Sequence, residues 1–190
     1  GDLSIPKDGK AIGQTRNAIV NPVWNAYSFF TLYANADHAK GNIIDDAESV
    51  LDRYILAKTR ELIETVEMKL DAYDIPAACN AIQLFMEALN NWYIRRARDR
   101  FWRAEKDADK QAAYDTLYTV LHNLSRVAAP FLPFITDKIY NGLTGEKSVH
   151  LAGWPDAKAL PEDRELVSAM DRTREVCSAA LSVRELEGLR

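Results

Sequence analysis

The residues best suited to hold a ligand lie in one short segment, 91–103, where they recur every three or four positions: Asn91, Arg95, Arg98 and Trp102. On a helix this spacing gathers them on one face. Guanidinium groups hold phosphates through paired hydrogen bonds, and an indole ring gives an unpaired base a surface to stack on. An asparagine amide both donates and accepts at a base edge. These residue types indicate an RNA interface, and a loop with splayed bases is the target that suits them.

The charge of the chain is distributed unevenly around this segment. The whole sequence has a net charge of −4, which by itself argues against a protein that binds nucleic acid. Residues 91–103 contain five arginines and one aspartate, a net charge of +4, so the remainder carries −8. Because the field that attracts phosphates is local, a basic segment on an acidic chain can still form a binding surface.

A structural role for the same arginines is the main alternative. Arg96 and Arg100 would then pair with acids on a neighbouring helix, and the aromatic residues around them would belong to the core. The solvent exposure of Arg95, Arg98 and Trp102 separates the two hypotheses. Full burial beside acidic partners would favour the structural role.

A second polar row lies near the start of the chain. Asn17, Asn21 and Asn25 are spaced by four residues, with Arg16 beside them. We interpret Asn17 as part of a solvated helix surface. For Asn21 and Asn25 both helix capping or solvation and contact with RNA remain open.

The motifs of enzymes and metal sites are missing from the sequence. None of His38, His122 and His150 follows a glutamate by three residues, as a di-iron bundle would require. There is no phosphate-binding loop, no His-Glu-x-x-His and no recognisable nucleophile motif. Cys79 and Cys177 are too far apart in sequence to form a typical metal-binding pair. We therefore predict no catalytic residue and no metal site.

Length and composition indicate an ordinary globular domain. The chain has 190 residues, of which 47% are hydrophobic and 27% charged. No stretch approaches the ~20 apolar residues that span a bilayer, and the first residues do not resemble a signal peptide. The two cysteines favour a reducing, cytoplasmic setting. Residues 1–13 are expected to be a lead-in segment, and residues 14–190 a helical domain cut from a longer protein.

The pattern of apolar residues predicts an all-α fold, an antiparallel helical bundle with an irregular loop near 144–161. No run of alternating β-branched residues predicts a strand. Helices are expected over about 14–35, 45–72, 74–103, 109–129, 134–143 and 162–187.

Capping and proline signals mark several of these boundaries. Asp74 is expected to cap the third helix, and Asp45 or Asp46 the second. Pro22 should either kink the first helix or occupy its first turn, in which case Asn21 is the N-cap. Residues 148–151 look extended.

Five blocks of the chain form a familiar series: 24–35, 51–56, 91–102, 124–134, and 148–151 with 154–155. Together they resemble one family, the class I isoleucyl-tRNA synthetases. Block 91–102 is similar to the most characteristic part of their anticodon-binding domain and separates the isoleucyl from the valyl branch. The Ala-Pro-Phe-x-Pro-Phe junction in block 124–134 is shared with the valyl and leucyl enzymes.

The resemblance implies a role that the spacing alone does not. These enzymes activate isoleucine with ATP and transfer it to isoleucine tRNA, but the nucleotide-binding signatures and the editing domain lie outside these residues. The resemblance thus implies a non-catalytic fragment whose partners are isoleucine tRNA and the catalytic and editing domains of the same chain. It also implies a monomer that does not contact a membrane. In members of the family that have a C-terminal zinc module, that module follows this region. Two alternatives remain: the same domain of a valyl or leucyl enzyme, and a free-standing enzyme.

One residue role is suggested by a related branch. In methionyl enzymes an Asn and an Arg four residues apart on the first bundle helix read anticodon bases, and alignment by eye puts Asn21 at the Asn. The Arg position becomes Trp24 or Asn25. The roles of the other residues rest on the shared helical face. The full set of expected tRNA-binding residues is Asn21, Asn25, Asn91, Arg95, Arg98 and Trp102.

Overall fold

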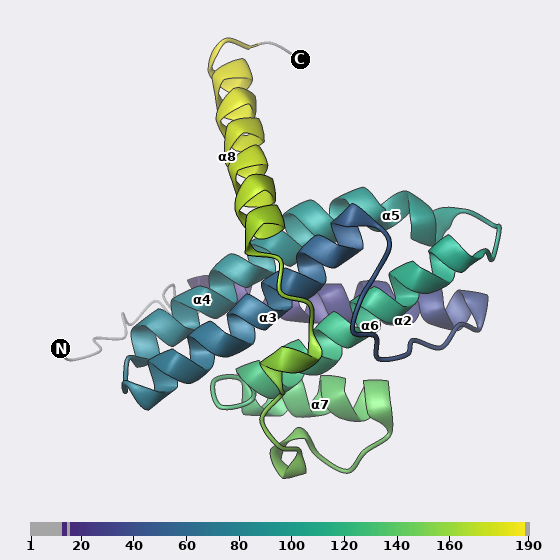
Figure 1. Cartoon of the computed structure of the whole chain (residues 1–190), viewed down its shortest axis with the longest axis vertical. Helices are drawn as coiled ribbons and strands as arrows, with labels where there is room; N and C mark the ends of the chain where they lie inside the picture. Colours follow the sequence, from purple (N-terminus) through teal and green to yellow (C-terminus); the bar gives the residue numbers. More distant parts are fainter. Residues whose placement is uncertain (1–12, 15, 189–190) are drawn as a thin grey trace.

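The computed structural model describes residues 13, 14 and 16–188, so the expected lead-in segment lies largely outside the described residues. Within this part of the chain the regular elements are helices and no strand occurs, as predicted (Figure 1). The elements are η1 (Arg16–Val20), α2 (Asn21–Asp37), α3 (Val50–Asp71), α4 (Ile75–Glu87), η2 (Ala88–Ile94), α5 (Arg95–Trp102), α6 (Ala108–Ala128), α7 (Pro133–Thr144), η3 (Val149–Leu151), η4 (Ala157–Ala159) and α8 (Arg164–Leu186).

The predicted third helix is present as three consecutive elements, α4, η2 and α5. It starts where expected, because the side chain of Asp74 accepts a hydrogen bond of 3.2 Å from the backbone N–H of Ala77. In its middle, η2 is a π-helix, with turns wider than those of an α-helix. Helical spacing predicted the length of this helix but gave no sign of the wide turns.

The expected N-cap at Asn21 is wrong. Val20, the residue before it, is already helical, with φ −64° and ψ −49°, and no side chain caps α2. The five residues of η1 form a π-helix that runs directly into α2. Pro22 lies in the first turn of α2, one of the two placements expected for it, and the chain runs from η1 into α2 without a break.

The expected caps of the second helix are also wrong. Asp45 and Asp46 lie before the start of α3 at Val50. Instead, the preceding chain is tied to α6, where the backbone N–H of Asn42 donates to Asp115 Oδ1 at 2.8 Å. This contact holds the segment against α6, and the helix starts only at Val50.

The loop near 144–161 is irregular as predicted, but residues 148–151 are not extended. They form the 3₁₀ turn η3. Asp137 on α7 accepts hydrogen bonds from Ser148 Oγ at 2.6 Å and from the N–H of Val149 at 2.9 Å. These two bonds pull the chain back towards α7, which produces a turn where the sequence pattern suggested an extended segment.

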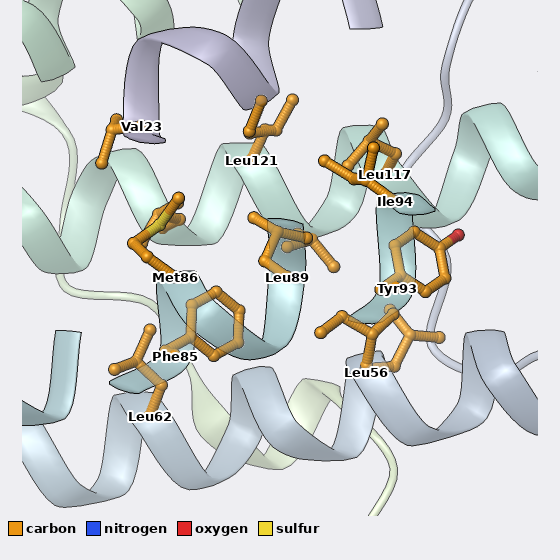
Figure 2. Packing of buried hydrophobic residues seen from close by; sticks show 14 of the residues in the cluster. Val23, Leu56, Leu62, Phe85, Met86, Leu89, Tyr93, Ile94, Leu117 and Leu121 are labelled. Carbon is orange, nitrogen blue, oxygen red and sulfur yellow. The ribbon is translucent and has the colours of Figure 1, made fainter. Parts of the chain in front are cut away.

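The core lies between α2, α3, the α4–η2–α5 helix and α6 (Figure 2). Each of these elements contributes apolar side chains from one face, as helical periodicity requires. The residues labelled in Figure 2 are Val23, Leu56, Leu62, Phe85, Met86, Leu89, Tyr93, Ile94, Leu117 and Leu121, all of them buried.

Helix α8 departs from the bundle. It leaves the body near α3 and projects outward (Figure 1). Val167 is its buried residue, and every residue from Ser178 to Leu186 is exposed. The bundle is therefore built by helices α2 to α7, and α8 lies beside it.

A buried carboxylate connects two of the core helices. Asp52 on α3 is fully buried and binds Arg100 of α5 through two hydrogen bonds, of 2.7 Å and 2.8 Å. The hydroxyl of Tyr93 donates to the same carboxylate at 2.8 Å. Burial by itself would lower the pKa of Arg100, but the hydrogen bonds to Asp52 outweigh it and raise that pKa. This arginine has the structural role that the alternative hypothesis gave it.

We expect Asp52→Ala to lower the free energy of unfolding by ~3–5 kcal/mol, because it leaves the guanidinium of Arg100 without its buried partner. Arg103→Ala is the matched control. Arg103 pairs with Asp107 at 2.9 Å on the surface, so its loss should cost only ~0–1 kcal/mol. Urea unfolding followed by circular dichroism measures both, and equal losses would contradict the assignment.

Candidate nucleic-acid interface

The segment predicted to bind a ligand presents its polar residues outward. Asn91, Arg95 and Arg98 are exposed, and Trp102 is 53% exposed. Asn91 lies in η2 and the others in α5, so one continuous helix positions all four. The solvent exposure of Arg95, Arg98 and Trp102 favours an interface over a purely structural role for these residues.

The arginines of this segment divide into two groups. In the described part of the chain, Arg95, Arg96 and Arg98 form no ion pair, and Arg96 lies over the ring of Trp92 instead of pairing with an acid. Arg100 binds Asp52, and Arg103 binds Asp107 and Asp109. A guanidinium without a carboxylate partner keeps its charge and hydrogen bonds available for a phosphate. On the predicted face, Arg95 and Arg98 are therefore the cations without a carboxylate partner among the described residues.

The side chain of Trp102 is fixed by one hydrogen bond and is half exposed to solvent. Its Nε1–H donates to the hydroxyl of Tyr33 on α2 at 2.5 Å. Arg98 Cζ lies 5.2 Å from the centroid of its ring, close enough for a cation–π contact. An indole that is fixed in position and half exposed is a suitable stacking surface for a base.

A cleft of about 350 Å³ lies between the start of the chain and the middle of the third helix. It brings together Asn25 from α2 and Asn91 and Arg98 from η2 and α5, and we call it the α2–α5 cleft. Asn90 secures one wall, because its Nδ2 donates to the carbonyl of Pro22 at 3.1 Å. Three of the predicted residues, distant in sequence, therefore line one hollow.

Asn21 is placed differently from the other predicted residues. It does not line the α2–α5 cleft, and its Nδ2 donates to Asn17 Oδ1 at 3.0 Å on the exposed side of the helix. Its neighbour one turn later, Asn25, does line the cleft. Of the two residues left open by the sequence, the structure brings only Asn25 next to the arginine face.

A larger cleft, of about 630 Å³, lies between α5 and α8, and we call it the α5–α8 cleft. Glu87 and Asn91 line both clefts, so the two hollows share one ridge. Its lining residues are Glu87, Asn91, Trp92, Arg95, Arg96, Arg174, Cys177, Ser178 and Leu181.

Glu87 and Arg174 also line this cleft, and neither was predicted from the sequence. A signal existed for Glu87, which precedes Asn91 by four residues and so falls on the same side of the helix. No signal existed for Arg174, because its place depends on where α8 crosses the bundle.

A polar cluster fixes the base of α8 to α3. Asp171 of α8 accepts hydrogen bonds from Tyr54 at 2.8 Å and from Lys58 at 2.5 Å. Arg174 donates to the same carboxylate at 2.8 Å. Burial by itself would raise the pKa of Asp171, but the hydrogen bonds from Lys58 and Tyr54 outweigh it and lower that pKa.

The described residues contain no group of three or more His, Cys, Asp or Glu side chains arranged to hold a metal ion. Among the helices that the structure describes, none is both long enough and apolar enough to cross a membrane.

Comparison with known proteins identifies the family. Residues 52–190 match the family described as the anticodon-binding domain of tRNA ligase. The chain belongs to this family. The all-helical architecture of the described residues is consistent with this family.

The relatives that match over the full chain are isoleucine–tRNA ligases. The chain is 52% identical to that of Corynebacterium efficiens, 48% to that of Leifsonia xyli and 44% to that of Wolbachia pipientis, in each case over 100% of its length. It spans about 17% of the length of these curated relatives. The resemblance to the isoleucyl branch is confirmed.

The lowered pKa of Asp171 leads to a pH-dependent prediction. A carboxyl whose folded pKa is depressed contributes stability above its unfolded value, near 3.8, and loses it as the pH falls through the folded pKa. We therefore expect Asp171→Asn to destabilise the chain at pH 6. The difference from the wild type should shrink steadily below about pH 4.

Urea unfolding at pH 6, 4 and 3 measures this difference. Asp156→Asn is the control, since Asp156 is exposed and caps only the short turn η4. A difference for Asp171→Asn that stays constant over the three pH values would contradict the prediction.

Proposed function

We propose that the chain binds the anticodon stem-loop of isoleucine tRNA through the face formed by α2, η2 and α5. The observation that carries the proposal is the pair of exposed arginines, Arg95 and Arg98, without acidic partners in the described residues, beside an exposed indole and a polar cleft. Membership of the anticodon-binding family supports the choice of RNA element, and the isoleucine–tRNA ligases among its relatives support the choice of tRNA.

The charge distribution supports docking in one orientation. The segment 91–103 carries +4 on a chain whose remainder carries −8. Phosphates are attracted to the basic face and repelled from the rest, because such fields act over about one Debye length, ~8 Å at physiological salt. Two of the five arginines are occupied by carboxylates, which leaves Arg95, Arg96 and Arg98 for the RNA.

The hollow and the indole suit the bases of a loop. At about 350 Å³ the α2–α5 cleft is of the size that receives a small planar ligand. Asn25 and Asn91 offer donors and acceptors to a base edge, and Trp102 offers a stacking surface worth ~1–3 kcal/mol per base. Asn21, one turn from Asn25 and exposed, stays in the proposed set as a contact at the rim.

In the complete protein this domain would act at a distance from the reaction. We infer that residues 14–190 form one domain of a cytoplasmic, monomeric isoleucine–tRNA ligase. Its catalytic domain activates isoleucine with ATP, and its editing domain lies in the same chain. A zinc module, where one exists, would follow this domain. The bound stem-loop supplies binding energy and orients the acceptor end for the transfer step.

Replacing Arg95 and Arg98 together with alanine should raise the KM for isoleucine tRNA about tenfold, equivalent to ~1.4 kcal/mol of lost binding. The rate of isoleucine activation by ATP should not change, because that step does not use the stem-loop. Aminoacylation and activation assays on the complete ligase measure both. Lys138→Ala with Lys158→Ala, which removes the same charge from exposed positions elsewhere, is the control. An unaltered KM for tRNA in the arginine variant would overturn the proposal.

Salt dependence gives an independent check on the same two arginines. Each phosphate contact to a single strand contributes about 0.7 to the slope of log K against log salt. The Arg95/Arg98 variant should therefore lose about 1.4 from the slope of the wild type. Titrations with isoleucine tRNA at several salt concentrations measure this slope, and the lysine control should retain it. Equal slopes in all three proteins would show that the two guanidiniums do not contact phosphates.

A further inference from the structure

We propose that the α5–α8 cleft is a second nucleotide site, which receives one unpaired nucleotide of the same RNA loop. This inference rests on the proposed function and adds α8, which nothing in the sequence associated with RNA. The cleft has a volume of about 630 Å³, within the range of sites that enclose a nucleotide-sized ligand.

Three arginines converge on this cleft from two helices. Arg95 and Arg96 come from α5 and Arg174 from α8. In the part of the chain that the structure describes, Arg95 and Arg96 form no ion pair. Arg174 uses Nη1 for Asp171 and Tyr54, while its Nη2 has no hydrogen bond there. Donors with unused capacity around one hollow are the arrangement that holds a phosphate.

Trp92, which also lines this cleft, has a buried donor without a partner among the described residues. Its side chain is only 8% exposed, and its Nε1 is buried without a hydrogen-bond partner among the described residues. Buried polar atoms are almost always paired, so an unpaired indole N–H beside a cleft points to an acceptor supplied by a ligand. Arg96 now covers the ring, with Cζ 3.1 Å from its centroid.

The cleft has a polarity that orients a nucleotide. Glu87, which lines both clefts, brings a carboxylate to the lining of the α5–α8 cleft. It repels a phosphate but accepts hydrogen bonds from base amino groups. The phosphate therefore lies towards Arg96 and Arg174, and the base towards Glu87 and Asn91. As the phosphate draws Arg96 off the ring, the indole of Trp92 becomes available to the base.

The cleft depends on the angle of α8. Asp171, held by Tyr54 and Lys58, fixes the base of that helix on α3. Beyond this anchor α8 projects (Figure 1), and Ser178 and Leu181 form the far wall of the cleft. α8 thus positions the second site without belonging to the core.

Two cysteines in the chain allow the site to be tested by alkylation. Cys177 lines the α5–α8 cleft, while Cys79 lies half-buried on α4 and lines neither cleft. In the complete ligase, with isoleucine tRNA at about ten times its Kd, roughly one-eleventh of the protein is free. We expect alkylation of Cys177 by iodoacetamide, followed by mass spectrometry, to slow about tenfold, and that of Cys79 to be unchanged. Equal rates at Cys177 with and without tRNA would overturn the second site.

A charge placed in the cleft provides the second measurement. Ser178→Glu adds a negative charge to the wall, whereas Ala180→Glu adds the same charge at an exposed position on the other side of α8. Ser178→Glu should raise the KM for tRNA about two- to fivefold, the effect of one partly exposed charge, and Ala180→Glu should not. Equal effects of the two variants would count against the site.

The two proposals fail in different ways. If Arg95 and Arg98 prove necessary for tRNA while Cys177 stays unprotected and Ser178→Glu behaves as wild type, the α2–α5 face stands and the second site is wrong. If the arginine variant binds tRNA normally, the proposed function fails and the second site fails with it.

Discussion

The exposed arginines point outward because one other arginine points inward. Asp52 is fully buried, and a buried carboxylate is stable only with partners, which Arg100 and Tyr93 provide. This contact fixes the rotation of α5 about its axis. Arg98 precedes Arg100 by two residues and Arg95 by five, which places them about 200° and 140° around the helix, on its far side. The ion pair in the core thus sets the direction of the cations on the surface.

The structural and the RNA-binding hypotheses therefore apply to different arginines of one segment. Arg100 and Arg103 connect elements through carboxylates, while Arg95 and Arg98 remain unpaired in the described residues. Whether an arginine is structural depends on which side of the helix it occupies, because only one side faces the acidic residues of neighbouring elements. Net charge hides this division, since an overall −4 coexists with a locally basic face.

The two clefts depend on backbone features of different kinds. The α2–α5 cleft lies where two π-helical segments, η1 and η2, meet α2 and α4, and wide turns of this type often occur at functional sites. The α5–α8 cleft depends on one polar cluster that fixes a projecting helix. Because Glu87 and Asn91 belong to both, a loop bound at one cleft has its next nucleotides close to the other.

The sequence by itself determined the helices, the N-cap at Asp74 and the polar face of the third helix, because these depend on residues a few positions apart. Two local signals failed for different reasons. The contact of α6 with the chain before α3 joins residues far apart in sequence, and neither Asp45 nor Asp46 caps α3. At Asn21 the preceding turns of η1 are already helical, so no cap is needed there. Only the tertiary structure decided which arginines are free and that α8 forms a second wall. Those outcomes depend on pairs such as Asp52 with Arg100 and Asp171 with Tyr54, whose partners are far apart in sequence and meet only after the helices have packed.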